Sequence, residues 1–217
     1  RHAAEEIERV GTHDQVVQVQ LPGVDQSPYG HQRYWPIYEA AESAGLPMAT
    51  HTATGSYGIA RAPTTGAGLP ISYPERHMVT AASIMGNLAS IVFEGVFVEY
   101  PDLEWVFMEG GVAWIPHFMW KMDKLWKGVG EATPWVENPP SRYIRDHIWF
   151  TTQPVEEPET PEHLAQLFEM IHADEILLFS SDYPHWDNDN PRTLFRQIDP
   201  GVQTKIFTEN ARTLYGL

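Results

Sequence analysis

The chain has 217 residues, of which 42% are hydrophobic, and it contains eight tryptophans. This length and composition are sufficient for one large domain with a packed core. Twenty-nine acidic against fourteen basic residues give a formal charge of −15, which repels nucleic-acid phosphates and anionic lipid surfaces. We therefore expect a globular protein that binds neither nucleic acid nor membrane.

The chain contains no cysteine. Disulfides, thiolate nucleophiles and zinc–thiolate sites are therefore excluded together, and any metal ion would be held by histidine and carboxylate side chains. No apolar stretch approaches the roughly 18 residues that span a bilayer, and the first residues form a charged helical pattern without the apolar segment of a signal peptide. These features predict a cytoplasmic protein.

Five short apolar segments are expected to form strands: residues 16–21, 47–51, 103–108, 148–152 and 176–179. Most of them are too continuous for strands with one exposed face, and this is typical of parallel sheets covered on both faces. Two long connections, residues 52–73 and 128–141, are expected to carry function or mobility.

Helical periodicity occurs between several of these segments. The apolar positions form two stripes: Ile115, Phe118, Met119, Met122 and Trp126, then Leu164, Leu167, Phe168 and Ile171. Thr160 and Asn190 each precede a proline, as N-cap residues often do. Thr208 and Gly216 are expected to begin and end the last helix.

Polar residues stand at or just after the carboxyl end of each expected strand: Gln20, His51, Glu109, Thr151, Thr152, Gln153 and Asp182. In a barrel these ends converge on one mouth and build a single site. The alternative is an open doubly wound sheet, but no Gly-x-Gly-x-x-Gly turn follows any of the five segments. We therefore favour a (β/α)8 TIM barrel of the α/β class.

A complete barrel needs eight strands, so about three strand–helix units, or roughly ninety residues, are not in this sequence. The chain also opens with a helical pattern that no strand precedes. We therefore expect residues 1–217 to be the C-terminal part of a single TIM-barrel domain, covering roughly its last five β/α units.

His51 and Asp182 are the strongest candidates for metal ligands, because imidazole nitrogen and carboxylate oxygen suit zinc or manganese. Taken singly, each also has a structural interpretation, as a satisfied histidine and as a helix cap or turn former. Glu109 precedes Gly110 and Gly111, whose backbones can approach a ligand closely, and it is either a general acid or base or a favourable residue at a helix N-terminus.

His185 follows Asp182 by one turn and is a candidate proton shuttle or substrate contact, with a surface loop position as the alternative. Trp114 and His77 are weaker candidates for substrate contacts. His147 stands at the beginning of a strand, the stability face of a barrel, so we expect it to be structural.

Four segments resemble a known family: GVFVEYPDLEWVFMEGGVAWIPHFMWKMDKLW (95–126), YIRDHIWFTTQPVEEP (143–158), LLFSSDYPHWD (177–187) and ENARTLYGL (209–217). They closely resemble the amidohydrolase-related family of the amidohydrolase superfamily, which includes the relatives of aminocarboxymuconate-semialdehyde decarboxylase and gamma-resorcylate decarboxylase.

The resemblance implies a (β/α)8 barrel whose mouth holds a divalent ion through two first-strand ligands, a fifth-strand histidine and an eighth-strand aspartate. His51 in MATHTA and Asp182 in SSDYPHWD match the last two. The first-strand pair is not in this sequence. Glu109 occupies the sixth-strand position where the decarboxylases carry a catalytic histidine before a glycine pair.

We therefore expect a metal-dependent hydrolase that acts on a small organic substrate, carboxylated or aromatic, with zinc as the ion and manganese as the alternative. Asp182, Glu109 and His185 would be catalytic, His51 and Asp182 would hold the metal, and Trp114 and His77 would contact substrate.

Three other interpretations stay open. Non-oxidative decarboxylation is the alternative within the family. The second is an inert truncated barrel without the first-strand ligands, and the third is a binding module that has lost its metal. A homo-oligomer is also conceivable, because exposed edge strands invite association.

Overall fold

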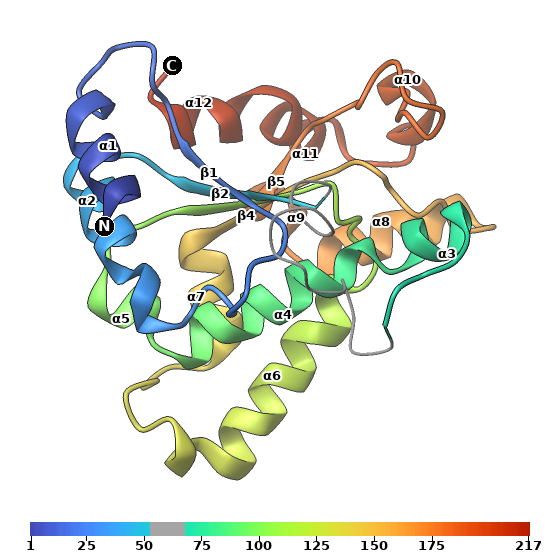
Figure 1. The fold of residues 1–217 in the computed structure, drawn as a ribbon. Coiled ribbons are helices and arrows are strands. Elements are labelled where there is room, and N and C mark those ends of the chain that lie inside the picture. Colours follow the sequence, from blue (N-terminus) through green and yellow to red (C-terminus); the bar gives the residue numbers. More distant parts are fainter. Residues whose placement is uncertain (53–67) are drawn as a thin grey trace.

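The structure is a computed structural model and describes residues 1–52 and 68–217. Residues 53–67, which make up most of the first long connection, lie outside the described residues. Five parallel strands form one sheet (Figure 1): β1 Val19–Pro22, β2 Met48–His51, β3 Trp105–Met108, β4 Ile148–Thr151 and β5 Leu177–Leu178.

The strand order in this sheet follows the order along the chain, β1-β2-β3-β4-β5. Each strand pairs in parallel with the next one along the chain. A doubly wound sheet reverses its order at a switch point, whereas an arc of a barrel does not. The predicted parallel α/β architecture is confirmed, and closure into an eight-stranded barrel with additional units stays a prediction.

Helices connect the strands. Those that precede β3 are α1 His2–Val10, η1 Gln32–Tyr34, α2 Trp35–Ser43, α3 Tyr73–Met78, α4 Thr80–Phe93 and α5 Val96–Glu99. Those that follow β3 are α6 Ile115–Val129, η2 Gly130–Ala132, α7 Pro140–His147, α8 Pro161–Met170, α9 Ala173–Ile176, α10 Pro191–Leu194, α11 Pro200–Thr204, the π-helix η3 Lys205–Glu209 and α12 Asn210–Tyr215. Within the described ranges, no helix combines the length and apolar character that crossing a membrane requires.

The larger core lies against one face of the sheet. Trp105 of β3 is fully buried there, with its ring centroid 5.4 Å from that of Tyr38 in α2. Its indole N–H donates to the buried Thr50 hydroxyl at 3.0 Å, so the polar edge of this large side chain is satisfied inside the core.

The other face of the sheet carries a small apolar cluster of Ala49, Val106 and Leu178, on which Ala211 and Leu214 of α12 pack. Figure 1 shows α4, α6 and α7 on one side of the sheet and α12 on the other. The strands are therefore covered on both faces, as their continuous apolar sequences predict.

Two predicted helix ends are present as expected. The Asn190 side chain caps α10 by accepting the Arg192 N–H at 3.0 Å. Gly216 ends α12 in the left-handed conformation, with φ of 65°. Thr160 stands at the N-cap of α8, but its side chain makes no capping hydrogen bond within the described structure.

The predicted helix start at Thr208 is wrong, because Thr208 lies inside η3, and α11, η3 and α12 follow one another without a break. Ile206 is buried in the main core, and the ring of Phe207 packs 5.0 Å from that of Phe195. This packing holds the chain helical through Thr208, so tertiary contacts override the capping preference.

His147 is a packing residue, as its position at the beginning of β4 predicts. Its ring stacks on Phe97 with centroids 4.6 Å apart, and its Nδ1 lies 3.1 Å from the Leu103 carbonyl oxygen. Burial lowers the pKa of His147, which favours the neutral ring.

Candidate active site

Three strand ends bring His51, Glu109 and Asp182 to the same edge of the sheet. His51 is the last residue of β2, Glu109 directly follows β3, and Asp182 lies in the loop that follows β5. The strands are parallel, so their carboxyl ends share one edge. His51 Nε2 lies 2.9 Å from Glu109 Oε1.

His51 and Glu109 form a half-buried pair, with side chains 23% and 26% exposed. The hydrogen bond with Glu109 raises the pKa of His51 against the effect of burial, and the charge of Asp182 adds to the rise. The bond with His51 lowers the pKa of Glu109, and a weaker contribution comes from a hydrogen bond with Asp182. His51 and Glu109 are therefore in direct contact, and Asp182 lies near enough to affect the pKa of each.

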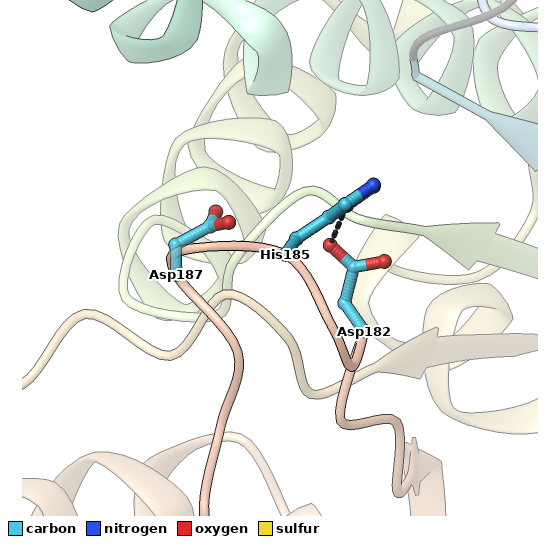
Figure 2. Close-up of side chains that lie close together, drawn as sticks. All are labelled: Asp182, His185 and Asp187. Carbon is cyan, nitrogen blue, oxygen red and sulfur yellow. Dashed lines mark hydrogen bonds and ion pairs between the residues drawn. The ribbon is translucent and has the colours of Figure 1, made fainter.

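The loop after β5 adds a second cluster, formed by Asp182, His185 and Asp187. His185 Nδ1 lies 2.5 Å from Asp182 Oδ2, and this hydrogen bond is the main cause of the raised pKa of His185. Figure 2 shows the three side chains on one side of the loop, with His185 between the carboxylates. One potential ligand atom from each lies within 4.8 Å of the others.

Helix α3 contacts this loop. His77 Nε2 lies 3.2 Å from Asp187 Oδ2. The indole N–H of Trp186 donates to the Tyr73 hydroxyl at 3.0 Å, and the rings of His77 and Trp186 have centroids 5.5 Å apart. These contacts join two segments that are distant in the sequence.

The groups enclose a pocket of about 150 Å³. Its described lining is Thr52, Tyr73, Arg76, His77, Thr80, Glu109, Gln153, Pro154, Asp182, His185 and Asp187. A cavity of roughly this volume accommodates benzene. The pocket therefore suits a molecule about the size of a single ring.

The predicted site residues differ in their relation to this pocket. Glu109, Asp182, His185 and His77 line it, and His51 contacts Glu109 beside it. The remaining candidate, Trp114, is elsewhere: its indole N–H donates to the Gly110 carbonyl at 2.8 Å and its ring packs against Phe118 and Phe150. A substrate contact by Trp114 stays a prediction.

Several pocket residues carry little sequence signal. Tyr73 and Arg76 line the pocket from α3, and no local periodicity or motif marks them as site residues. Gln153 is buried and its amide N–H donates to Asp187 Oδ2 at 3.3 Å. Its position at a strand end could have marked it as a site residue, and Asp187 was visible in the polar turn after β5.

The family model described as amidohydrolase matches residues 1–217. The chain belongs to the amidohydrolase family. The family resemblance of its four sequence segments is therefore confirmed. No curated protein sequence matches this amidohydrolase.

Solved structures share its fold. An amidohydrolase from Mycobacterium avium subsp. paratuberculosis is 21% identical with a TM-score of 0.76, and the match covers 98% of this chain and 55% of that one. The 5-carboxyvanillate decarboxylase from Sphingomonas paucimobilis is 23% identical with a TM-score of 0.71, and the match covers 99% of this chain and 62% of that one. A third structure is a dihydroxybenzoic acid decarboxylase from Polaromonas sp. JS666, with bound manganese and the inhibitor 2-nitroresorcinol. It is 20% identical with a TM-score of 0.67, and the match covers 99% of this chain and 65% of that one. This amidohydrolase chain thus spans less than two thirds of each.

Proposed function

We propose that this chain builds one side of the active site of a metal-dependent, non-oxidative decarboxylase for small aromatic carboxylates. The observation that carries the proposal is the convergence of His51, Glu109 and Asp182 beside one ring-sized pocket. Membership of the amidohydrolase family and the likeness to decarboxylases of ring carboxylates support it. Decarboxylation thereby takes precedence over the hydrolysis that we expected from the sequence.

The donor groups at this position fit a divalent ion. His51 offers an imidazole nitrogen, and Asp182 and Glu109 offer carboxylate oxygens, which suit zinc or manganese. Asp182 lies close enough to affect the pKa values of both His51 and Glu109, so its negative charge favours a cation here. We propose that His51 and Asp182 hold the ion. Manganese is the first ion to test, in place of zinc, because the similar Polaromonas decarboxylase contains it.

When bound, the ion would supply positive charge that holds the substrate and stabilises the negative charge developing on it. Asp182 raises the pKa of His185, whose Nδ1 lies 2.5 Å from Asp182 Oδ2, and this favours the protonated imidazole. The proton of His185 would pass through Asp182 to the ring carbon as the bond between the ring carbon and the carboxylate carbon breaks and CO2 leaves. Arg76, in the pocket lining, would attract the substrate carboxylate.

Hydrolysis is the second candidate, and Glu109 is the observation in its favour. This residue stands where the decarboxylases carry histidine, and its lowered pKa makes it a better proton acceptor than donor at neutral pH. In such a reaction Glu109 would accept the proton of an attacking water.

The test is an assay of the manganese-loaded protein with CO2 release as the readout. The substrates are 5-carboxyvanillate and 2,6-dihydroxybenzoate, after which similar solved decarboxylases are named. A set of aryl esters and lactones tests hydrolysis in parallel. We expect CO2 release that falls at least about 100-fold in Asp182→Asn, and no change in His163→Gln, an exposed histidine of α8. Ester or lactone hydrolysis without CO2 release would favour the second candidate, and a protein that takes up no metal and has neither activity would favour the inert barrel.

A further inference from the structure

A carboxylate outside the described pocket lining holds the turn that follows β3. Glu156, in the connection between β4 and α8, accepts hydrogen bonds at Oε2 from two backbone N–H groups, those of Val112 at 2.9 Å and Ala113 at 3.0 Å. Charge-assisted bonds of this kind are stronger than bonds between neutral groups. One side chain therefore ties the segment after β3 to the loop after β4.

The glycine pair of this segment has a structural purpose that the sequence did not reveal. Gly111 has φ of 66°, and a Cβ built there would overlap the Glu156 carboxylate. A Cβ at Gly110 would overlap the Ile84 side chain. In the structure these glycines let Glu156 and Ile84 approach, and the close approach of a ligand that we expected from the sequence stays a prediction.

Glu109 needs such support because its own backbone is strained. Its φ of 58° lies in the left-handed region, which costs a non-glycine residue roughly 1 kcal/mol or more. Two neighbouring strand ends hold it: its N–H donates to the Thr151 hydroxyl at 3.1 Å, and its carbonyl accepts from the Thr52 hydroxyl at 3.2 Å. Glu156 holds Val112 and Ala113, which follow Glu109 and the glycine pair.

We propose that Glu156 is a positioning residue, which acts through residues 109–113 to keep the Glu109 carboxylate against His51. If Glu156 is removed, the amides of Val112 and Ala113 lose their acceptor and the strained turn can relax. Glu109 Oε1 would then leave its position 2.9 Å from His51 Nε2. The proposal deepens the proposed function and rests on it wherever activity is the readout.

The first experiment compares Glu156→Ala, Glu156→Gln and Glu157→Gln in the manganese-loaded enzyme. We expect kcat to fall roughly 10- to 100-fold in Glu156→Ala, because Glu109 contacts the proposed metal ligand His51 and small displacements within a site have effects of this size. KM should change less than about threefold, because Glu156 does not line the described pocket. Glu156→Gln keeps an oxygen that can accept both N–H groups and should recover most of kcat.

Glu157→Gln is the matched control, because it removes the same charge from the next residue, which is also exposed. Equal losses in Glu156→Ala and Glu157→Gln would overturn the proposal in favour of a general charge effect. An unchanged kcat in Glu156→Ala, or a change confined to KM, would overturn it as well.

A second measurement separates this proposal from the proposed function. Hydrogen–deuterium exchange follows the backbone amide of Glu109, which Glu156 does not contact directly. Exchange should be faster in Glu156→Ala than in the parent and unchanged in Glu157→Gln. A parent protein without decarboxylase activity would contradict the proposed function alone, whereas an unaltered Glu109 amide in Glu156→Ala would contradict the positioning role, whatever the reaction.

Discussion

Glu109 and Asp182 share the left-handed backbone conformation, with φ of 58° and 54°, although they follow different strands. A residue with a Cβ occupies this region at a cost of about 1–3 kcal/mol, and such strain clusters at functional sites. Asp182 also contributes to the lowered pKa of Glu109, so the two carboxyl groups lie near each other. The fold thus holds two strained residues where their charges meet, an arrangement that opposes stability and suits cation binding.

Asp182→Asn should separate the effect of this charge on stability from its effect on cation binding. Asparagine tolerates the left-handed conformation, and the substitution removes one of two adjacent negative charges. We expect the Tm of the metal-free protein to stay constant or rise by a few degrees, while the increase of Tm on addition of Mn²⁺ disappears. Differential scanning calorimetry with and without Mn²⁺ measures both. Asp14→Asn, at an exposed position, should behave as the parent. A full Mn²⁺ effect in Asp182→Asn would remove Asp182 from the ligand set.

Metal affinity should increase with pH. A proton on His51 competes with the ion, and the hydrogen bond with Glu109 raises the pKa of His51. Below that pKa, each decrease of one pH unit should lower the affinity for Mn²⁺ about tenfold. Isothermal titration calorimetry between pH 6 and pH 8 tests this, and proton release appears as a dependence of the heat on the buffer.

Glu109→Gln provides the matched variant for this pH dependence. It removes the charge that holds the proton on His51, so the rise in affinity should move to lower pH. If the pH dependence is the same in Glu109→Gln and the parent, His51 is not the group that competes with the metal.

Asp189 should make the protein less stable at neutral pH. It is 6% exposed and accepts the Val155 N–H at 3.0 Å. Burial, with smaller contributions from neighbouring carboxylates, raises its pKa from 3.8 to about 6. The folded protein therefore favours the neutral carboxyl, and stability is lost as pH rises from the lower value through the higher one.

Asp189→Asn retains an oxygen acceptor without the charge. Relative to the parent, its free energy of unfolding should gain about 2 to 3 kcal/mol between pH 4 and pH 7. Urea unfolding at a series of pH values measures this difference, with Glu159→Gln, an exposed residue, as the control. A difference that does not vary with pH would show that Asp189 is not the titrating group.

Trp186 should contribute to substrate binding and little to stability. Trp186 is 73% exposed, and it contacts Tyr73 and His77 of α3, which line the pocket. Loss of one aromatic contact is worth roughly 0.5–1.5 kcal/mol, so Trp186→Ala should raise KM about 2- to 10-fold and change Tm little. Trp120→Ala, on α6 and 59% exposed, is the control. Equal effects of Trp186→Ala and Trp120→Ala on KM would contradict a contribution of Trp186 to substrate binding.

The sequence by itself determined the strands, their parallel class and three of the four helix ends that we predicted, those at Thr160, Asn190 and Gly216. These properties depend on neighbouring residues: continuous apolar runs at residues 47–51 and 103–108, a proline after Asn190, and Gly216 at a helix end. Such patterns act within a few residues, so they can be interpreted without the path of the chain. The positions of His51, Glu109 and Asp182 at strand ends followed from the same patterns.

Only the tertiary structure decided which side chains meet. Helix α3 contacts Asp187 and Trp186, and Glu156 accepts hydrogen bonds from the amides after Gly111. The chain is also helical through Thr208 because of core packing. Each of these features depends on contacts between segments that are separated in the sequence. Hydrogen bonds and packing act over a few ångströms in space, whatever the separation along the chain. Local patterns therefore located the edge of the sheet at which the site forms, and the fold determined which residues line the pocket and which residues hold them in position.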